Sequence, residues 1–282
     1  METTTAPEAP ARRPQKRQQA VLEVRSKTRL SPRLLRITLG GELFSALNRN
    51  EQADAYVKLL LPDPSTGLQP PFDLERLREE SPELLPSRRT YTVRRWFDDE
   101  QAIQLDVVLH SAADGQAEGV ASRWADAAQP GDRVALMGAG GGYTPEQSTA
   151  RHLLIGDHSA LPAIAASLEA MDPAAVGFAL IHLDHEEDRL RLEAPAGVEV
   201  RWVIGDRERL LEAVTALDLA ETAGLQVFCH AERGLTKRLR RVLVAERGVP
   251  REQISISAYW ALGRVEDQFQ AEKREPIGAI DD

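Results

Sequence analysis

The chain has 282 residues, of which 42% are hydrophobic and 28% are charged, and its formal net charge is −9. These values are typical of a soluble protein long enough for two domains, and no apolar run reaches the roughly 18 residues needed to cross a bilayer. The negative charge argues against nucleic acid as the main partner, because phosphate binding requires an excess of Lys and Arg. We therefore expect neither nucleic acid nor a membrane as a partner.

The N-terminal segment, residues 1–19, is rich in Pro, Ala and basic residues and predicts a disordered tail. It lacks the apolar centre of a signal peptide, and the single Cys229 excludes an internal disulfide framework. Both features favour a cytoplasmic location.

Residues 20–147 predict an antiparallel six-stranded β-barrel. Residues 21–39 alternate apolar and polar side chains on both sides of a Ser31-Pro32 turn signal, which indicates a hairpin. Further strands are expected at 55–61, 89–97, 103–110 and 133–137, with one helix near 121–128. The segment 65–87 is rich in Pro, Glu and Arg and is expected to be a long excursion between strands.

Residues 148–269 predict a doubly wound α/β domain with a parallel sheet. Apolar strands are expected at 152–156, 178–183, 198–204, 225–229 and 254–258, and helices at 161–171, 207–219 and 235–247. The polar residues 270–282 predict a flexible C-terminus. A barrel followed by such a sheet suits two cofactors, a flavin on the barrel and a nicotinamide at the carboxyl ends of the strands.

The strongest candidate for a cofactor site is the strand segment 88–94, with the sequence RRTYTVR. Alternation places Arg89, Tyr91 and Val93 on one face of the strand. Arginine can grip a pyrophosphate, an aromatic ring can stack on an isoalloxazine, and the backbone and hydroxyl of Thr92 can hydrogen-bond the flavin ring. The alternative is an exposed, charged strand with a half-buried tyrosine.

A helix start about 25 residues later offers a second half for a pyrophosphate site. The run Gly119-Val120-Ala121-Ser122 combines free backbone N–H groups, a glycine and a hydroxyl. The alternative is an ordinary Ser cap above a buried Trp124. His110 ends the preceding strand, and we expect from it a hydrogen bond to the flavin or its ribityl chain.

Two other motifs resemble a dinucleotide-binding loop and a metal site, but neither has the residues such a site requires. The run GAGGGY at 138–143 has Tyr143 at the third required position and no helix directly after it, so it is not a dinucleotide loop. We expect a tight turn there, with Tyr143 free to pack against a cofactor edge. The His and acidic residues at 182–187 lack regular ligand spacing, so we predict no metal site.

The first strand of the second domain turns into its helix at residues 156–163, GDHSALPA, where nicotinamide-binding loops lie. Consecutive Asp, His and Ser side chains point in different directions, which excludes a hydrolytic relay. The last strand ends in Tyr259 and Trp260, at the edge where the two domains are expected to meet. Trp260 is a candidate to cover the flavin face that Tyr91 leaves open.

Together these segments resemble the siderophore-interacting protein family, the FAD-dependent ferric-siderophore reductases related to ferredoxin-NADP reductases. The resemblance runs from about residue 21 to residue 269. It is carried by YVKLLLP at 56–62, RTYTVR at 89–94, ASRWA at 121–125, PGD at 130–132, ALPA at 160–163, Arg240-Arg241, GVP at 248–250, and Tyr259-Trp260 with Gly263. Motifs in this order across both domains are far more specific than any one of them.

The resemblance implies bound FAD and either NADH or NADPH as the electron donor. The expected FAD contacts are Arg89, Tyr91, Thr92, Val93, Asp106, Val108, His110, Ala121, Ser122 and Trp260. The expected nicotinamide contacts are Asp157, His158, Ser159 and Glu232, and the cations Lys58, Arg94 and Arg264 are expected to attract the substrate, although each can also be a plain surface charge. No residue is assigned a catalytic role of its own, because the flavin carries the chemistry.

Three stretches differ from the pattern of the family. Asp157-His158-Ser159 stands where Asp-Glu-Thr is usual, alanines 231 and 258 replace glycines, and the loop 111–118 is longer. The first two differences bear on the nucleotide contacts, and the third bears on the substrate entrance.

The function implied is reduction of a ferric siderophore, which releases Fe(II) because oxygen-rich chelators prefer Fe(III). Two alternatives stay open, namely a general flavin or ferredoxin-type reductase with a non-iron acceptor, and a non-catalytic siderophore-binding module. We expect a cytoplasmic monomer.

Overall fold

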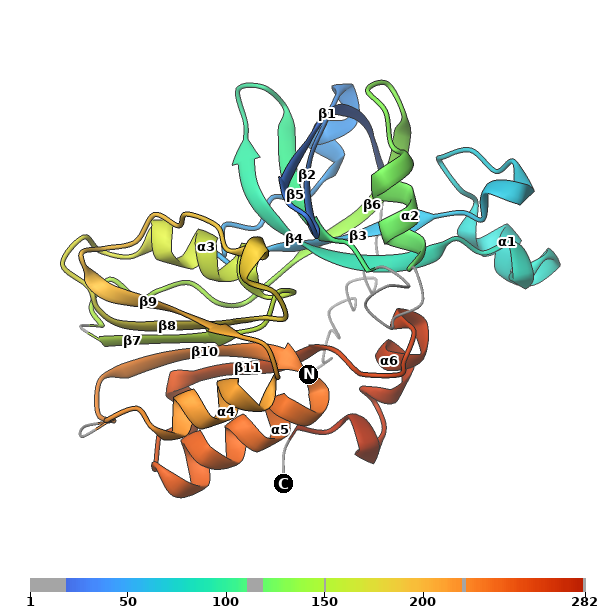
Figure 1. Ribbon diagram of the computed structural model, residues 1–282. Coiled ribbons are helices and arrows are strands. Elements are labelled where there is room, and N and C mark those ends of the chain that lie inside the picture. The colour runs from blue at the N-terminus through green and yellow to red at the C-terminus, as the bar shows by residue number, and fades with distance from the viewer. Residues whose placement is uncertain (1–18, 111–118, 150, 220–221, 281–282) are drawn as a thin grey trace, which may run out of the picture.

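The structure is a computed structural model, and it describes residues 19–110, 119–149, 151–219 and 222–280. The predicted disordered tail, up to residue 18, and the long loop 111–118 lie outside these ranges. The described residues form a β-barrel packed against a three-layered α/β unit (Figure 1).

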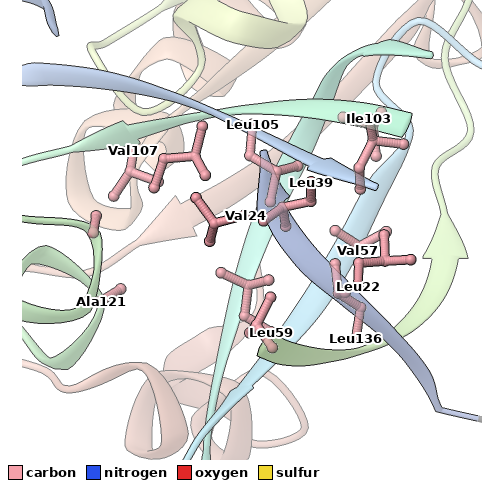
Figure 2. Close-up of a cluster of buried hydrophobic side chains, with 14 of the residues drawn as sticks. Leu22, Val24, Leu39, Val57, Leu59, Ile103, Leu105, Val107, Ala121 and Leu136 are labelled. Carbon is pink, nitrogen blue, oxygen red and sulfur yellow. The ribbon is translucent and has the colours of Figure 1, made fainter. Parts of the chain in front are cut away.

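The barrel is closed and antiparallel, in the strand order β1-β2-β5-β4-β3-β6, which confirms the predicted six-stranded barrel. Its strands are β1 (Ala20–Ser31), β2 (Leu34–Gly40), β3 (Tyr56–Leu61), β4 (Ser87–Phe97), β5 (Ala102–Val108) and β6 (Arg133–Gly140). Alternate residues such as Leu22, Leu59 and Leu105 point inward and are fully buried, so the barrel interior is a packed core (Figure 2).

Two helices belong to the barrel unit. Helix α2 (Val120–Ala127) lies against the barrel wall, and Ala121 packs into the barrel core (Figure 2). Helix α1 (Leu74–Glu80) lies in the segment that was expected to be an excursion, and the side chain of Asp73 caps it by accepting from the N–H of Arg76.

The second unit is a parallel sheet in the order β11-β10-β7-β8-β9, which confirms the predicted α/β architecture. Its strands are β7 (Arg151–Gly156), β8 (Val176–Leu183), β9 (Gly197–Ile204), β10 (Leu225–Glu232) and β11 (Ile254–Trp260). The helices are α3 (Leu161–Ala170), α4 (Glu208–Thr215) and α5 (Arg233–Arg240), which continues as a π-helical turn (Arg241–Glu246). Helix α3 covers the face toward the barrel, and α4 and α5 cover the opposite face (Figure 1).

The two units share a hydrophobic core. Leu34 of β2 is fully buried in a cluster that contains Leu161 of α3 and Phe228 of β10. Barrel side chains therefore complete the core of the second unit.

The chain ends in helix α6 (Glu266–Glu272) and a 3-10 turn (Pro276–Gly278). Phe269 is buried against Ala258 and Ala261, and Gly278 approaches the helix so closely that a Cβ atom would lie 2.0 Å from the carbonyl oxygen of Glu272. The boundary predicted at residue 270 thus falls inside α6, and the flexibility of the C-terminus stays a prediction. In the part of the chain that the structure describes, no helix is long and apolar enough to span a membrane.

Candidate functional site

The first half of β4 presents Arg89 and Tyr91 on the same side of the barrel wall. Their register partners on β3 are Leu59 and Val57, which both lie in the barrel core. The Arg89 side chain is 16% exposed, and Tyr91 packs against that core. Burial raises the pKa of Tyr91, the charge of Glu266 adds to the rise and the nearby Arg89 opposes it, so the phenol is neutral. A guanidinium thus lies beside a half-buried ring, as the strand pattern predicted.

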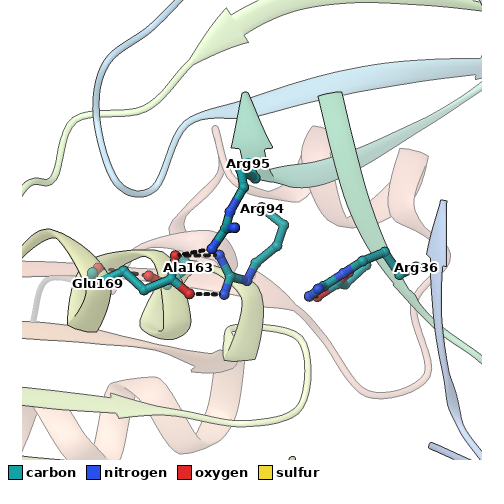
Figure 3. A network of polar contacts seen from close by, with 7 residues as sticks. Arg36, Arg94, Arg95, Ala163 and Glu169 are labelled. Carbon is teal, nitrogen blue, oxygen red and sulfur yellow. Dashed lines mark hydrogen bonds and ion pairs between the residues drawn. The ribbon is translucent and has the colours of Figure 1, made fainter. Parts of the chain in front are cut away.

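The alternation ends at a β-bulge between Val93 and Arg95. Because of the bulge, Arg94 and Arg95 both ion-pair with Glu169 of α3 (Figure 3). The Arg94 side chain is only 9% exposed, so the structure places this expected substrate cation in the domain interface. Burial raises the pKa of Glu169, but the hydrogen bonds and charges of the two arginines outweigh it and hold that pKa below its ordinary value.

Asp106 also belongs to the interface. Its carboxylate makes two 2.7 Å contacts with Arg36 of β2, and both residues line a cavity of about 180 Å³ together with Leu161 of α3. The structure therefore gives Asp106 an arginine as its partner, where a flavin contact was expected.

The start of α2 brings three expected flavin residues together. The hydroxyl of Ser122 accepts from the backbone N–H of His110 at 3.2 Å and donates to the carbonyl oxygen of Val108 at 3.4 Å. The N-cap residue of α2, Gly119, has no side chain, so within residues 119–127 no N-cap side chain accepts from the first N–H groups of the helix. Ala121 belongs to the same barrel core as Leu59, the register partner of Arg89, so both predicted halves of the pyrophosphate site border that core. An uncapped helix start, a guanidinium and an aromatic ring are a donor set that fits FAD.

Asp157 organises the carboxyl ends of the parallel strands. Its Oδ1 accepts from the N–H of Ser159 at 2.9 Å and from the hydroxyl of Ser159 at 2.5 Å. Its Oδ2 accepts from the N–H of Glu232 at 2.9 Å and from the indole N–H of Trp260 at 2.7 Å. One buried carboxylate thus joins the ends of β7, β10 and β11 at the point where the strand order reverses, which is where α/β sheets bind ligands.

Glu232 and Trp260 are fixed at the same edge. Glu232 caps α5 by accepting from the N–H of Leu235 at 3.0 Å, and its second oxygen accepts from the N–H of Leu262 at 3.1 Å. Trp260 lies 5.6 Å beneath the guanidinium of Arg207. Trp260 was expected to cover the flavin but groups with the expected nicotinamide residues.

His158 lies at the junction of the two units. Its Nε2 is buried, and no group in the described residues hydrogen-bonds it. Burial lowers the pKa of His158, the nearby carboxylates led by Asp188 oppose the shift, and His110 adds to it. Asp188 in turn accepts from the hydroxyl of Ser31 at 2.7 Å and from the N–H of Arg33 at 3.0 Å, both on the barrel hairpin.

A row of rings that sequence reasoning missed leads from the sheet to the flavin strand. Ring centroids are 4.9 Å apart for Tyr143 and Phe228, 4.2 Å for Phe228 and His230, and 4.7 Å for His230 and Tyr259. Burial raises the pKa of Tyr259 overall, and the side chain of Thr92 on β4 lies close enough to Tyr259 to lower that pKa slightly. Tyr143 is buried in the interface core and packs on Phe228, where we expected it at a cofactor edge.

Helix α6 contributes residues to the candidate site that the sequence analysis did not include. Asp267 pairs with Arg89 and Glu266 with Thr90, each at 3.2 Å. Desolvation lowers the pKa of Lys273. The charge of Glu266 opposes this shift, whereas the charge of Lys58, an expected substrate cation, adds to it. Another expected substrate cation, Arg264, ion-pairs with Glu272 at 2.6 Å.

Sequence comparisons agree with this geometry. The profile of the siderophore-interacting FAD-binding domain matches residues 23–143, and that of the siderophore-interacting protein matches residues 149–263. Ferric vibriobactin reductase ViuB of Vibrio cholerae is 30% identical over 259 residues, which cover 90% of this chain and 93% of that protein. This chain belongs to the siderophore-interacting protein family.

Solved structures of the same family and of ferredoxin reductases superpose on this chain. The siderophore-interacting protein SipS from Aeromonas hydrophila is 28% identical and superposes with a TM-score of 0.77, covering 93% of this chain and 98% of that one. Ferredoxin-NADP+ reductase from Plasmodium falciparum superposes with a TM-score of 0.62 at 11% identity, covering 86% of this chain and 96% of that one. At that identity only the fold is shared. This siderophore-interacting protein thus has the two-domain fold of ferredoxin-NADP reductases, with its FAD-binding domain in the barrel.

Proposed function

We propose that this protein is an FAD-dependent NAD(P)H oxidoreductase that reduces the iron of a ferric siderophore. The observation that carries the proposal is the meeting of two sites on β4. Arg89 and Tyr91 lie opposite Leu59 and Val57 of the barrel core, which α2 joins through Ala121, and Thr92 lies near Tyr259 of the sheet. A donor at the sheet edge would thereby lie next to an acceptor on the barrel.

Each part of the FAD site has a defined role in this proposal. Arg89 and the first N–H groups of α2 would bind the pyrophosphate, and the ring of Tyr91 would stack on the isoalloxazine. Thr92, which lies near Tyr259, would orient the flavin ring. FAD, when bound, accepts hydride from a nicotinamide and releases electrons one at a time.

The nicotinamide nucleotide would bind at the carboxyl edge of the sheet. Asp157 and Glu232 are saturated with hydrogen bonds, so they would shape the crevice. Nε2 of His158 is buried and no described residue hydrogen-bonds it, which makes this atom the candidate contact for a ligand. The edge does not distinguish NADH from NADPH, and both are proposed as donors.

The ferric chelate would bind beside α6. Lys58 and Lys273 lie close together there, and Leu262 and Val265 expose apolar side chains on either side of Arg264. These groups would attract an anionic chelate, and no protein ligand to iron is required because reduction itself weakens the chelate. A cytoplasmic location and a monomeric state stay predictions.

Absorption spectroscopy tests the proposal. Purified protein incubated with FAD should be yellow, should bleach anaerobically with NADH or NADPH, and should recover its colour with a ferric siderophore while a ferrous trap reports Fe(II). Faster reoxidation by quinones or free flavins than by ferric chelates would favour a general reductase. Chelate binding without NAD(P)H oxidation would favour a binding module, and protein that takes up no flavin would refute the proposal.

A further inference from the structure

The C-terminal helix places two carboxylates on the strand that would hold FAD. Asp267 Oδ2 lies 3.2 Å from Nη1 of Arg89, and Glu266 Oε1 accepts a hydrogen bond from the hydroxyl of Thr90 at 3.2 Å. The guanidinium proposed for the flavin pyrophosphate therefore already has an anionic partner, contributed by a segment 178 residues away in the chain.

The helix is held firmly at its other end. Phe269 is 1% exposed, and Glu272 ion-pairs with Arg233 of α5 and with Arg264, each at 2.6 Å. Asp267 lies in the first turn of α6, and its side chain is 58% exposed. Its carboxylate can therefore leave Arg89 by rotating into solvent while the anchors of the helix stay in place.

We propose that Asp267 competes with the FAD pyrophosphate for Arg89, so that α6 sets how tightly and how fast this protein takes up its cofactor. The inference rests on the proposed function, because it requires FAD at Arg89. Asp267 already holds Nη1 of the guanidinium, and a diphosphate bound to the same group would lie a few ångströms from its carboxylate, where the like charges repel each other. Glu266 strengthens the competition by holding the start of α6 against Thr90.

FAD titration followed by quenching of flavin fluorescence tests the proposal without reference to activity. Asp267→Asn removes the charge and keeps the shape, and it should tighten FAD binding about twofold to fivefold, because exposed ion pairs contribute up to about 1 kcal/mol. The gain should shrink at high salt. Glu275→Gln is the matched control. This exposed carboxylate lies in the same C-terminal segment, but no hydrogen bond or ion pair among the described residues joins it to β4, so the substitution should leave the FAD affinity unchanged.

A double-mutant cycle makes the test specific. In an Arg89→Ala background, Asp267→Asn should tighten FAD binding less than it does in the wild type, because the shared partner is gone and only the repulsion between the two anions remains. Wild-type protein that binds FAD, together with an Asp267→Asn variant of equal or weaker affinity, would overturn the competition and leave the proposed function intact. Failure of every variant and of the wild type to bind FAD would overturn the proposed function as well.

Discussion

At the scale of single residues, the predicted cofactor contacts differ in whether protein groups already hydrogen-bond their side chains. Asp157 and Asp106 were both expected to contact a cofactor, yet every oxygen of each carboxylate is engaged by protein donors. Among the described residues, Arg89 shares its guanidinium with an exposed carboxylate and a neighbouring carbonyl. The first two residues therefore shape the site, whereas Arg89 can exchange its partner for a ligand.

Replacement of Arg89 by alanine should weaken FAD binding by about 1.5–3 kcal/mol, the range for a charge-assisted hydrogen bond. This corresponds to a rise in Kd of roughly 10-fold to 150-fold, measurable by flavin fluorescence. The neighbouring Arg88→Ala is the control, because Arg88 is exposed and points away from the barrel core. Equal losses in both variants would indicate a general effect of positive charge.

His230 should make the protein less stable in mild acid. Burial lowers its pKa from 6.5 to about 3, so the unfolded chain binds a proton in a pH range where the folded protein does not. Stability is then complete above pH 6.5 and falls as the pH drops toward 3, by about 2 kcal/mol between pH 7 and pH 5. Urea unfolding of wild type and His230→Phe should show a shallower pH dependence in the variant, with a remainder from His152, whose pKa burial also lowers. Parallel curves would contradict this assignment.

At the scale of elements, the hairpin β1-β2 and the segment after β8 meet at Asp188. The carboxylate is 1% exposed, and it accepts from Ser31 and from both the backbone and the guanidinium of Arg33. Burial raises the pKa of Asp188, but these hydrogen bonds outweigh it and lower that pKa below its ordinary value. The stabilisation from this contact is therefore present above pH 4 and is lost as the pH falls further.

Asp188→Ala should destabilise the protein by about 3 kcal/mol, because it strands buried donors and breaks a largely buried ion pair. Asp188→Asn should cost about half as much, since its amide oxygen can still accept from Ser31 and from the backbone of Arg33. Chemical denaturation at pH 7 measures both. If the two variants were equally stable, the charge rather than the hydrogen bonds would carry the contact.

At the scale of the whole molecule, the barrel and the sheet share one core, so we expect them to unfold together. Leu34 and Leu35 are adjacent on β2 but face opposite ways, Leu34 into the shared cluster and Leu35 into the barrel interior. This pair separates interface packing from barrel packing.

Leu34→Ala and Leu35→Ala should each cost about 3 kcal/mol, because both leucines are almost completely buried. Calorimetry should nevertheless distinguish them. Leu34→Ala should split the thermal transition into two, since it loosens the contact between the units, whereas Leu35→Ala should shift a single transition downward. A single transition for both variants would mean that the polar interface contacts suffice to couple the units.

The sequence alone predicted the barrel, the parallel sheet and their order, because apolar periodicity and turn residues act over a few positions. It also selected Arg89, Tyr91 and the start of α2, which lie in strongly patterned segments. It missed α6. The seven residues of this helix are mostly polar, and one apolar core residue, Phe269, is too few to produce a helical periodicity in the sequence.

Only the tertiary structure decided which partners these residues have. Asp157 and Trp260 are 103 positions apart, Ser31 and Asp188 are 157 apart, and Arg94 is turned toward Glu169 by a bulge. Hydrogen bonds and ion pairs act over about 3 Å in space, whatever the separation along the chain. Local patterns therefore fix the elements and the residues they carry, while the packing of the elements determines which side chains stay free to bind a ligand.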